Sequence, residues 1–251
     1  MRTLSKLASL MSLQAFILMG CAADGEPNAA DEDEGVVLAQ QAAAGGGVDL
    51  TGTWFARVKT SVKITAPLIG ASTAPSELAI KLFVQRANGT LNIAAQICKL
   101  QTDSANLKID YVKVLPYMKV AASEPDFEAA IGAKVPLPTL NFRIGIDAAG
   151  ASVDVDGDKN AGGTLPIVAL GLLGINSYTG LNLSIAMDAT LKAADLIEGT
   201  SNFAGSGKIF GSNNPLLTAG EFVVEQMTNP TTFTSKRLAG DVSCADLLKQ
   251  P

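Results

Sequence analysis

The feature that most constrains this chain is a strict alternation of side-chain types that begins at Trp54. The even positions of this run are Trp54, Ala56, Val58, Thr60, Val62 and Ile64, and the residues between them are mostly charged or polar. Successive side chains of a β-strand point to opposite faces, so this period of two predicts a strand with one buried face. Phe55 is the one large apolar residue on the other face.

Two further alternating runs, residues 78–85 and 90–97, flank the dipeptide Asn88-Gly89. Both residues of this dipeptide tolerate positive φ, and its position between two such runs predicts a tight β-hairpin. On the second run the alternation places Leu91, Ile93, Ala95 and Ile97 inward. Cys98 is therefore expected on the outer face.

Strand-like runs continue to the end of the chain, at residues 107–111, 140–146, 181–188, 203–210, 221–227 and 232–238. A break in the register near Tyr111–Val114 suggests a bulge. Residues 116–138 are predicted to be irregular, because prolines punctuate them. About eight to ten strands with almost no helical periodicity predict an all-β domain. A single antiparallel β-barrel is the first expectation and a β-sandwich the alternative.

The longest uncharged stretch, residues 160–187, is not predicted to be a transmembrane helix. Gly162, Pro166 and Gly174 are among several residues that would interrupt a helix there. Residues 165–175 are expected to form a buried strand pair, and an exposed apolar loop at a barrel mouth is the alternative.

Residues 1–20 have the three parts of an export signal. Arg2 and Lys6 open the segment, an apolar core follows, and Leu18-Met19-Gly20-Cys21 ends it. This tetrad resembles the lipobox of bacterial lipoproteins. The resemblance implies a diacylglycerol on Cys21, cleavage before it and acylation of the new amino terminus. The alternative is a plain secretory signal with an incidental cysteine.

The residue after Cys21 bears on the destination of the protein. Ala22 stands where lipoproteins retained in the inner membrane of well-studied Gram-negative bacteria carry Asp. The resemblance therefore favours an outer-membrane lipoprotein, on the periplasmic face or at the cell surface.

Residues 21–47 are predicted to be a flexible tether. The segment holds six acidic residues and no Lys or Arg, and it ends in Gly45-Gly46-Gly47. Its like charges repel one another, and it has too little apolar surface to offset the entropy cost of ordering. An acidic recognition patch or a surface-export signal is the alternative. The folded domain is then residues 48–251.

The charge of the chain is concentrated in this tether. Two of the 19 basic residues and six of the 24 acidic residues precede residue 48, which leaves the folded domain with a net charge of −1. Nucleic-acid binding is not expected, because it needs a clustered basic surface. The chain contains no histidine, which excludes Ser-His-Asp and Cys-His catalysis and imidazole metal sites. We therefore do not expect an enzyme.

Cys98 and Cys244 are the two cysteines that are left when Cys21 carries lipid. In an exported protein two such cysteines are predicted to form a disulfide. Because Cys98 is expected on the outer face of its strand, the bond would hold the C-terminal segment against the outside of the sheet.

The first predicted strand opens with Val48-Asp49-Leu50-Thr51-Gly52-Thr53-Trp54. This stretch resembles the first-strand signature of the lipocalin-like proteins (calycins), a Gly-x-Trp that enters strand A. The resemblance implies an antiparallel barrel in which Gly52 and Trp54 have a structural role and Trp54 plugs the closed end. It covers only this stretch, and the C-terminal helix usual in that family is not evident.

One short loop carries oxygen-bearing side chains at alternate positions, Asp154, Asp156, Asp158 and Asn160. Such spacing is how one loop surrounds a hard cation, and it resembles the acidic loops of extracellular calcium repeats. It departs from an EF-hand, with Gly157 in fourth place and Leu165 where a bidentate Glu would stand. A calcium ion here would be structural. The alternative is an Asp/Gly turn between strands.

These features predict a membrane-anchored lipoprotein whose barrel binds or carries a small hydrophobic ligand. The predicted interior is rich in Leu, Ile, Val and Ala, with few large aromatic residues to fill it. The alternative is a non-enzymatic structural or interaction module of the cell envelope. Such a module would have a solid interior and loops that meet a partner, and calcium would stabilise it if the acidic loop binds the ion.

Overall fold

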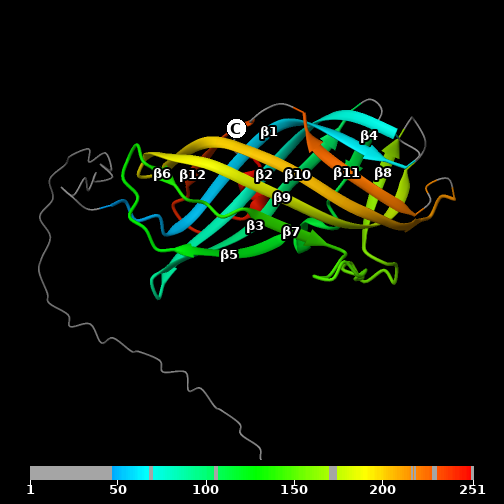
Figure 1. Ribbon diagram of the computed structural model, residues 1–251, viewed down its shortest axis with the longest axis horizontal. Helices are drawn as coiled ribbons and strands as arrows, with labels where there is room; N and C mark the ends of the chain where they lie inside the picture. The colour runs from blue at the N-terminus through cyan, green and yellow to red at the C-terminus, as the bar shows by residue number, and fades with distance from the viewer. Residues whose placement is uncertain are drawn as a thin grey trace, which may run out of the picture. The chain divides into compact units, whose positions relative to one another are not determined.

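The computed structural model describes residues 47–67, 70–104, 107–169, 174–215, 217, 219–227 and 231–249. These residues form one antiparallel β-sheet of twelve strands, with one short 3₁₀ helix and one short α-helix (Figure 1). Residues 1–46, which hold the predicted signal, Cys21 and nearly all of the tether, lie outside the described residues. Within the described part, neither helix is long and apolar enough to cross a membrane.

The elements follow one another along the chain with these bounds: β1 (Gly52–Ala66), β2 (Gly70–Ala87), β3 (Thr90–Asp103), β4 (Leu107–Asp110), η1 (Leu115–Tyr117), β5 (Lys119–Pro125), β6 (Lys134–Val135), β7 (Leu140–Ile144), β8 (Gly163–Ala169), β9 (Ile175–Ala193), β10 (Leu196–Ser212), β11 (Gly220–Gln226), β12 (Thr231–Arg237) and α1 (Cys244–Leu247). An all-β domain with antiparallel pairing is therefore confirmed.

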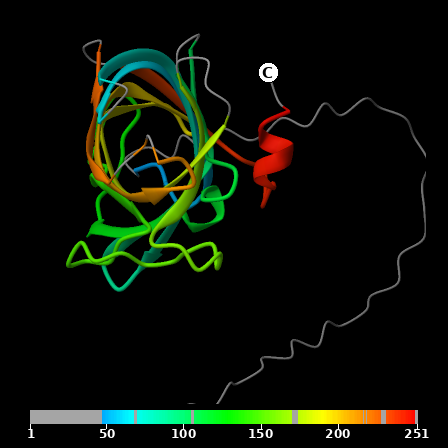
Figure 2. The ribbon, with the colours of Figure 1, turned by 90° about the vertical axis from the view of Figure 1, so that its right-hand side faces the viewer.

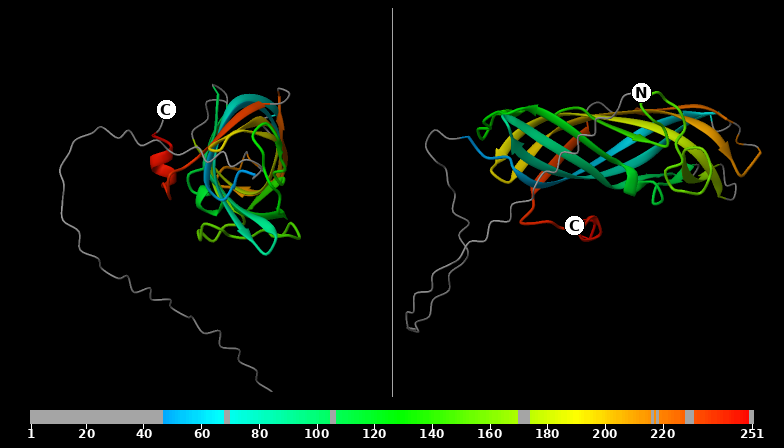
Figure 3. Two further views of the ribbon diagram at one scale, coloured as in Figure 1. Left: turned by 90° about the vertical axis from the view of Figure 1, so that its left-hand side faces the viewer. Right: turned by 90° about the horizontal axis from the view of Figure 1, so that it is seen from below.

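The strands form a ring in which each strand is hydrogen-bonded to its neighbours. β1 pairs with β2, β2 with β3, β3 with β4, β4 with β8, β8 with β9, and β9 with β10. β10 pairs with both β11 and β12, and each of these pairs with β1, where the path began. Figure 2 shows this ring from one end, and Figure 3 shows it from the other end and from below.

The twelve strands lie in eight rows, because three rows are interrupted. β11 and β12 pair with the two halves of β1, β4 and β5 pair with the two halves of β3, and β6, β7 and β8 pair in turn with β9. The predicted count of about eight to ten strands was therefore too low. Pro136 and Pro138 explain one interruption, since proline cannot donate to the strand ladder. β5 lies within residues predicted to be irregular, so that prediction was wrong there.

The alternation in β1 and the hairpin that follows β2 are both as predicted. Trp54, Val58 and Ile64 belong to the main apolar cluster inside the ring. Asn88 and Gly89 connect β2 to β3 with φ angles of 53° and 72°, the left-handed conformation that the dipeptide was expected to adopt.

The apolar segment 165–175 forms a strand pair over its described residues. Leu165 and Ile167 of β8 are buried, and Ile167 pairs with Ile175 at the start of β9. The buried strand pair is therefore confirmed for these residues, while 170–173 lie outside the described part of the chain.

Phe55, the exception to the alternation, is buried on the outer face of the ring. It forms a small cluster with Ala79, Cys98 and Leu247, separate from the interior. α1 lies outside the ring (Figure 2), and Cys244 at its start is bonded to Cys98. The predicted disulfide is confirmed, and it holds the C-terminal segment against the outer wall.

Lys81 holds the same segment in place. Its side chain is buried on the outer wall, where Nζ donates to the Val242 carbonyl oxygen at 2.6 Å and pairs with the Asp241 carboxylate. The C-terminal segment is therefore attached by a covalent bond, an apolar cluster and an ion pair.

Removing the disulfide should lower the stability of the fold. The two cysteines are 146 residues apart, and closing such a loop is worth roughly 5 kcal/mol at most in the chain-entropy model. We expect the Cys98→Ala/Cys244→Ala protein to unfold at lower urea concentration while its far-UV circular dichroism stays that of a β protein. Reduced wild-type protein is the control, and it should match the variant. Equal midpoints for the oxidised and reduced proteins would contradict the expectation.

Candidate functional site

The interior of the ring contains a cavity of about 50 Å³ near one end. Ile64 and Ala66, at the end of β1, line it. Trp54 stands ten residues earlier on the same strand, which corresponds to about 33 Å at the usual rise per residue. A smaller void of about 20 Å³ lies beside Trp54. The larger cavity and Trp54 therefore lie toward opposite ends of the ring.

The wall of the larger cavity is almost wholly apolar and comes from seven strands and two adjoining residues. Its apolar members are Ile64, Ala66, Leu100, Leu107, Ile109, Leu165, Ile167, Leu181, Leu183, Phe203, Gly205, Ile209, Leu217, Phe222 and Val224. The remaining members are hydroxyl-bearing: Thr102, Tyr111, Ser177 and Thr179. None of these lining residues carries a formal charge or an amide side chain.

Local strand geometry explains why four hydroxyls point into the ring. On β9 the inward positions continue back from Leu183 and Leu181 to Thr179 and Ser177, and all four are buried. Thr102 occupies the inward position near the end of β3. Tyr111 follows β4, where its row is interrupted and the backbone N–H of Val114 donates to the Tyr111 carbonyl oxygen at 2.9 Å.

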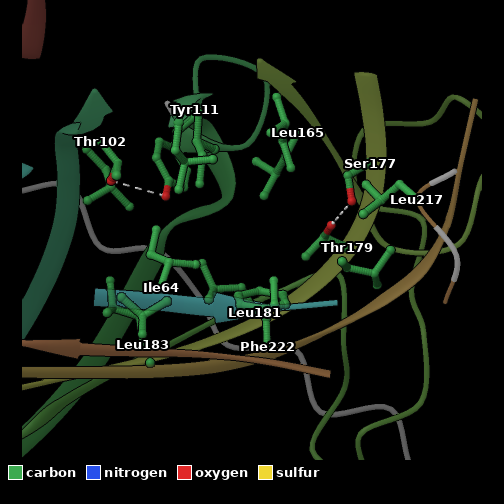
Figure 4. A pocket seen from close by; sticks show the side chains of 18 of the residues that line it. Ile64, Thr102, Tyr111, Leu165, Ser177, Thr179, Leu181, Leu183, Leu217 and Phe222 are labelled. Carbon is green, nitrogen blue, oxygen red and sulfur yellow. Dashed lines mark hydrogen bonds between the residues drawn. The ribbon is translucent and has the colours of Figure 1, made fainter. Parts of the chain in front are cut away.

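The hydroxyls form two pairs that face each other across the cavity (Figure 4). Ser177 Oγ and Thr179 Oγ1 are 2.8 Å apart, and Thr102 Oγ1 and Tyr111 Oη are 3.5 Å apart. Burial raises the pKa of Tyr111 to about 12, although the hydrogen bond with Thr102 acts in the opposite direction. The phenol is therefore neutral at physiological pH.

Gly52 and Trp54 are found at the far end of the ring. Gly52 has a φ of 125°, in a region that favours glycine. Trp54 is fully buried, its indole N–H donates to the Leu50 carbonyl oxygen at 2.9 Å, and the Arg237 guanidinium lies 4.8 Å from its ring centroid. This geometry accounts for a packing role. Its interpretation as the plug of a closed barrel end stays a prediction.

The acidic loop lies in the interruption between β7 and β8. One carboxylate oxygen from each of Asp154, Asp156 and Asp158 lies within 4.8 Å of the others, so the structure brings the three predicted acidic ligands together. Asn160 adjoins them, and its backbone N–H donates to Asp158 Oδ1 at 2.9 Å.

Hydrogen bonds to the loop's own backbone and to Thr164 already hold most of these oxygens. Asp154 accepts from the N–H groups of Gly157 and Lys159 at 2.8 Å each. Thr164 donates its N–H to Asp156 and its hydroxyl to Asp158, and that hydroxyl bond is the main cause of a lowered Asp158 pKa. Among the described residues, Asp156 Oδ1 is buried and has no hydrogen-bond partner. Turn formation and cation binding both fit this geometry, so calcium stays a prediction.

The hydroxyl pairs were not predicted from the sequence. Ser177 and Thr179 lie in the uncharged stretch 160–187 and occupy successive inward positions just before the apolar face of β9. Polar residues at inward positions of an otherwise apolar strand face were the available signal. Thr102 also occupies an inward strand position, and the alternation breaks near Tyr111–Val114. That the interrupted row turns Tyr111 into the ring is a tertiary feature, which the sequence did not predict.

The calcium prediction can be tested by thermal unfolding. A bound ion stabilises only the folded state, so the unfolding temperature should be higher in buffer with CaCl₂ than in buffer with a chelator. The CaCl₂ concentration should be several times a Kd of about 1 mM, as for extracellular calcium modules. Asp156→Asn is the informative variant, since it removes charge from the carboxylate with an unpartnered oxygen, and it should abolish the rise. Asp147→Asn, outside the cluster, is the matched control. Equal midpoints in the two buffers would leave the loop as a turn.

Neither a protein-family model, nor a curated protein, nor a solved structure matches this chain. The ligand that the cavity could bind is therefore inferred from the lining residues alone. An apolar cavity with two hydroxyl pairs can hold a nonpolar molecule and orient it through one or two hydrogen bonds.

Proposed function

We propose that this protein is a lipid-anchored outer-membrane protein whose ring of strands is a lipocalin-like barrel that binds a small hydrophobic ligand. The observation that carries the proposal is the apolar cavity beside Ile64, enclosed by side chains from seven strands. Its wall offers a ligand dispersion contacts and burial from water, with hydroxyls to fix its orientation.

Two features support the barrel interpretation. The eight rows return to their starting strand, and an eight-stranded barrel has an interior just wide enough for side chains or one small ligand. Gly52 and Trp54 lie away from the cavity, which agrees with one packed end and one binding end.

Residues 18–21 support the membrane anchor. The resemblance to a lipobox implies more than one acyl chain on Cys21, which is what stable membrane attachment requires. A flexible tether over residues 22–47 would have an average end-to-end distance of about 30 Å, so the domain could stand clear of the lipid surface.

A second candidate function is a structural or interaction module of the envelope, and the size of the cavity favours it. About 50 Å³ is room for a few water molecules, whereas pockets for drug-sized ligands measure roughly 300–1,000 Å³. The rest of the interior is filled by one continuous apolar cluster. A ligand of the first function must therefore be narrow, and an aliphatic chain must displace side chains of the wall as it enters. A protein of the second function would bind none.

The anchor is tested by metabolic labelling with an alkyne analogue of palmitate. We expect the wild-type chain to take up the label and to sediment with outer membranes, and Cys21→Ser to lose the label. The matched control is Cys98→Ser/Cys244→Ser, which changes the other cysteines and should keep the label. Labelling of the Cys21→Ser protein would contradict the assignment.

The cavity is tested by native mass spectrometry. For this test, residues 21–251 with Cys21→Ser are exported behind a secretory signal and purified without detergent. We expect a co-purified hydrophobic compound, and we expect Ala66→Phe, which fills the cavity, to lose it. Ala204→Phe, which places the same ring on the outer face of β10, is the control and should retain the compound.

Ligand-free protein that also fails to bind aliphatic compounds added to it would contradict the binding function. That outcome would favour the structural module.

A further inference from the structure

We infer that the cavity selects neutral aliphatic molecules that carry one hydrogen-bonding oxygen, such as alcohols, esters or ketones, over ionised fatty acids. The inference rests on the proposed binding function and narrows its ligand class. It follows from the two hydroxyl pairs, Ser177 with Thr179 and Thr102 with Tyr111, and from the lack of a cation among the lining residues.

Charged groups on the strands that line the cavity lie on the opposite face. Those next to the lining residues alternate with them, so the pleat of each strand directs them outward: Lys63, Lys99, Asp103, Lys108, Asp110, Lys208, Glu221 and Glu225. Five of them are exposed, and Lys63, Lys99 and Asp103 are half-buried. Each of these three is paired with an opposite charge, at Glu225, Glu77 and Lys108 respectively. The one titratable lining residue is Tyr111, whose pKa of about 12 keeps it neutral.

An ionised carboxylate would find hydroxyl donors in such a site but no cation to offset its charge. Burying an unpaired charge is unfavourable enough that the group binds a proton instead. A carboxylic acid with an ordinary pKa near 4.3 is protonated in roughly one molecule in a thousand at pH 7.5. The acid should therefore bind in its neutral form, with an apparent affinity that rises about tenfold for each unit by which the pH falls toward that pKa.

The hydroxyl pairs suit a ligand oxygen. Each pair has two O–H donors, and one hydrogen bond between the two oxygens uses only one of them. Among the described residues, no acceptor is found for the second O–H of either pair. A carbonyl, ester or hydroxyl oxygen placed between the pairs would accept a hydrogen bond that the apolar wall cannot offer.

The test compares 1-decanol with decanoate, which have the same chain length and differ in the charge of the head group. Isothermal titration calorimetry uses residues 21–251 with Cys21→Ser at pH 7.5 and pH 5.5. We expect decanol to bind at least tenfold more tightly than decanoate at pH 7.5. We expect the Kd of decanoate to fall by about a hundredfold at pH 5.5 and that of decanol to stay unchanged.

The outcomes separate the inference from the proposed function. If neither compound binds at either pH, the binding function fails and the inference fails with it. If decanoate binds as tightly as decanol and without pH dependence, binding stands and the inference is overturned.

Variants of the hydroxyl pair test its role directly. Ser177→Ala/Thr179→Val should weaken decanol binding about two- to tenfold, which corresponds to one net hydrogen bond. Thr179→Ser keeps a hydroxyl and should retain the affinity. Ser235→Ala removes a buried hydroxyl beside Trp54 and is the matched control, with unchanged affinity expected. Unchanged decanol affinity in the folded Ser177→Ala/Thr179→Val protein would overturn the role of these hydroxyls.

Discussion

Antiparallel hydrogen bonding from strand to strand around the ring, which passes from β4 to β8 between two interrupted rows, is the constraint on which the rest of the structure depends. β9 and β10 are the longest neighbouring pair of strands. β11 and β12 each pair with β10 and with β1, and these pairings close the ring. Pairing of this kind leaves few unpaired strand edges. It also fixes which side chains share the interior, because each strand contributes every second residue to it.

The distinctive features of the protein lie where this pairing is interrupted. The row of β4 and β5 breaks at residues 111–118, and Tyr111 enters the cavity wall there. The row of β7 and β8 breaks at residues 145–162, which carry the acidic loop. Gly145 begins that break with a φ of 65°, and a Cβ on it would lie 2.4 Å from the Thr179 carbonyl oxygen, so only glycine fits. The interruptions thus add the Tyr111 hydroxyl and the acidic loop, whereas the other three hydroxyls of the cavity come from regular strands.

Local patterns predicted the parts of the fold that depend on near neighbours. The alternation after Trp54 and the Asn88-Gly89 turn needed only strand and turn geometry, and the cysteine count together with the outward position of Cys98 predicted its bond to Cys244. The number of strands was not predicted, because row interruptions depend on pairing between distant segments. The meeting of the two hydroxyl pairs was not predicted for the same reason, since residues 102 and 111 face residues 177 and 179 only after the ring is formed. Cys21 and its lipid lie outside the described residues.

Methyl NMR during titration with 1-decanol is the sharpest test of whether one end of the packed ring encloses a binding cavity. We expect the methyl signals of Ile64, Leu107 and Leu217, which line the cavity, to shift on titration. Signals of Ile80 and Leu82, paired with Ala56 and Trp54 toward the other end, should stay in place. No shift at any of these residues, or equal shifts at both ends, would contradict this expectation.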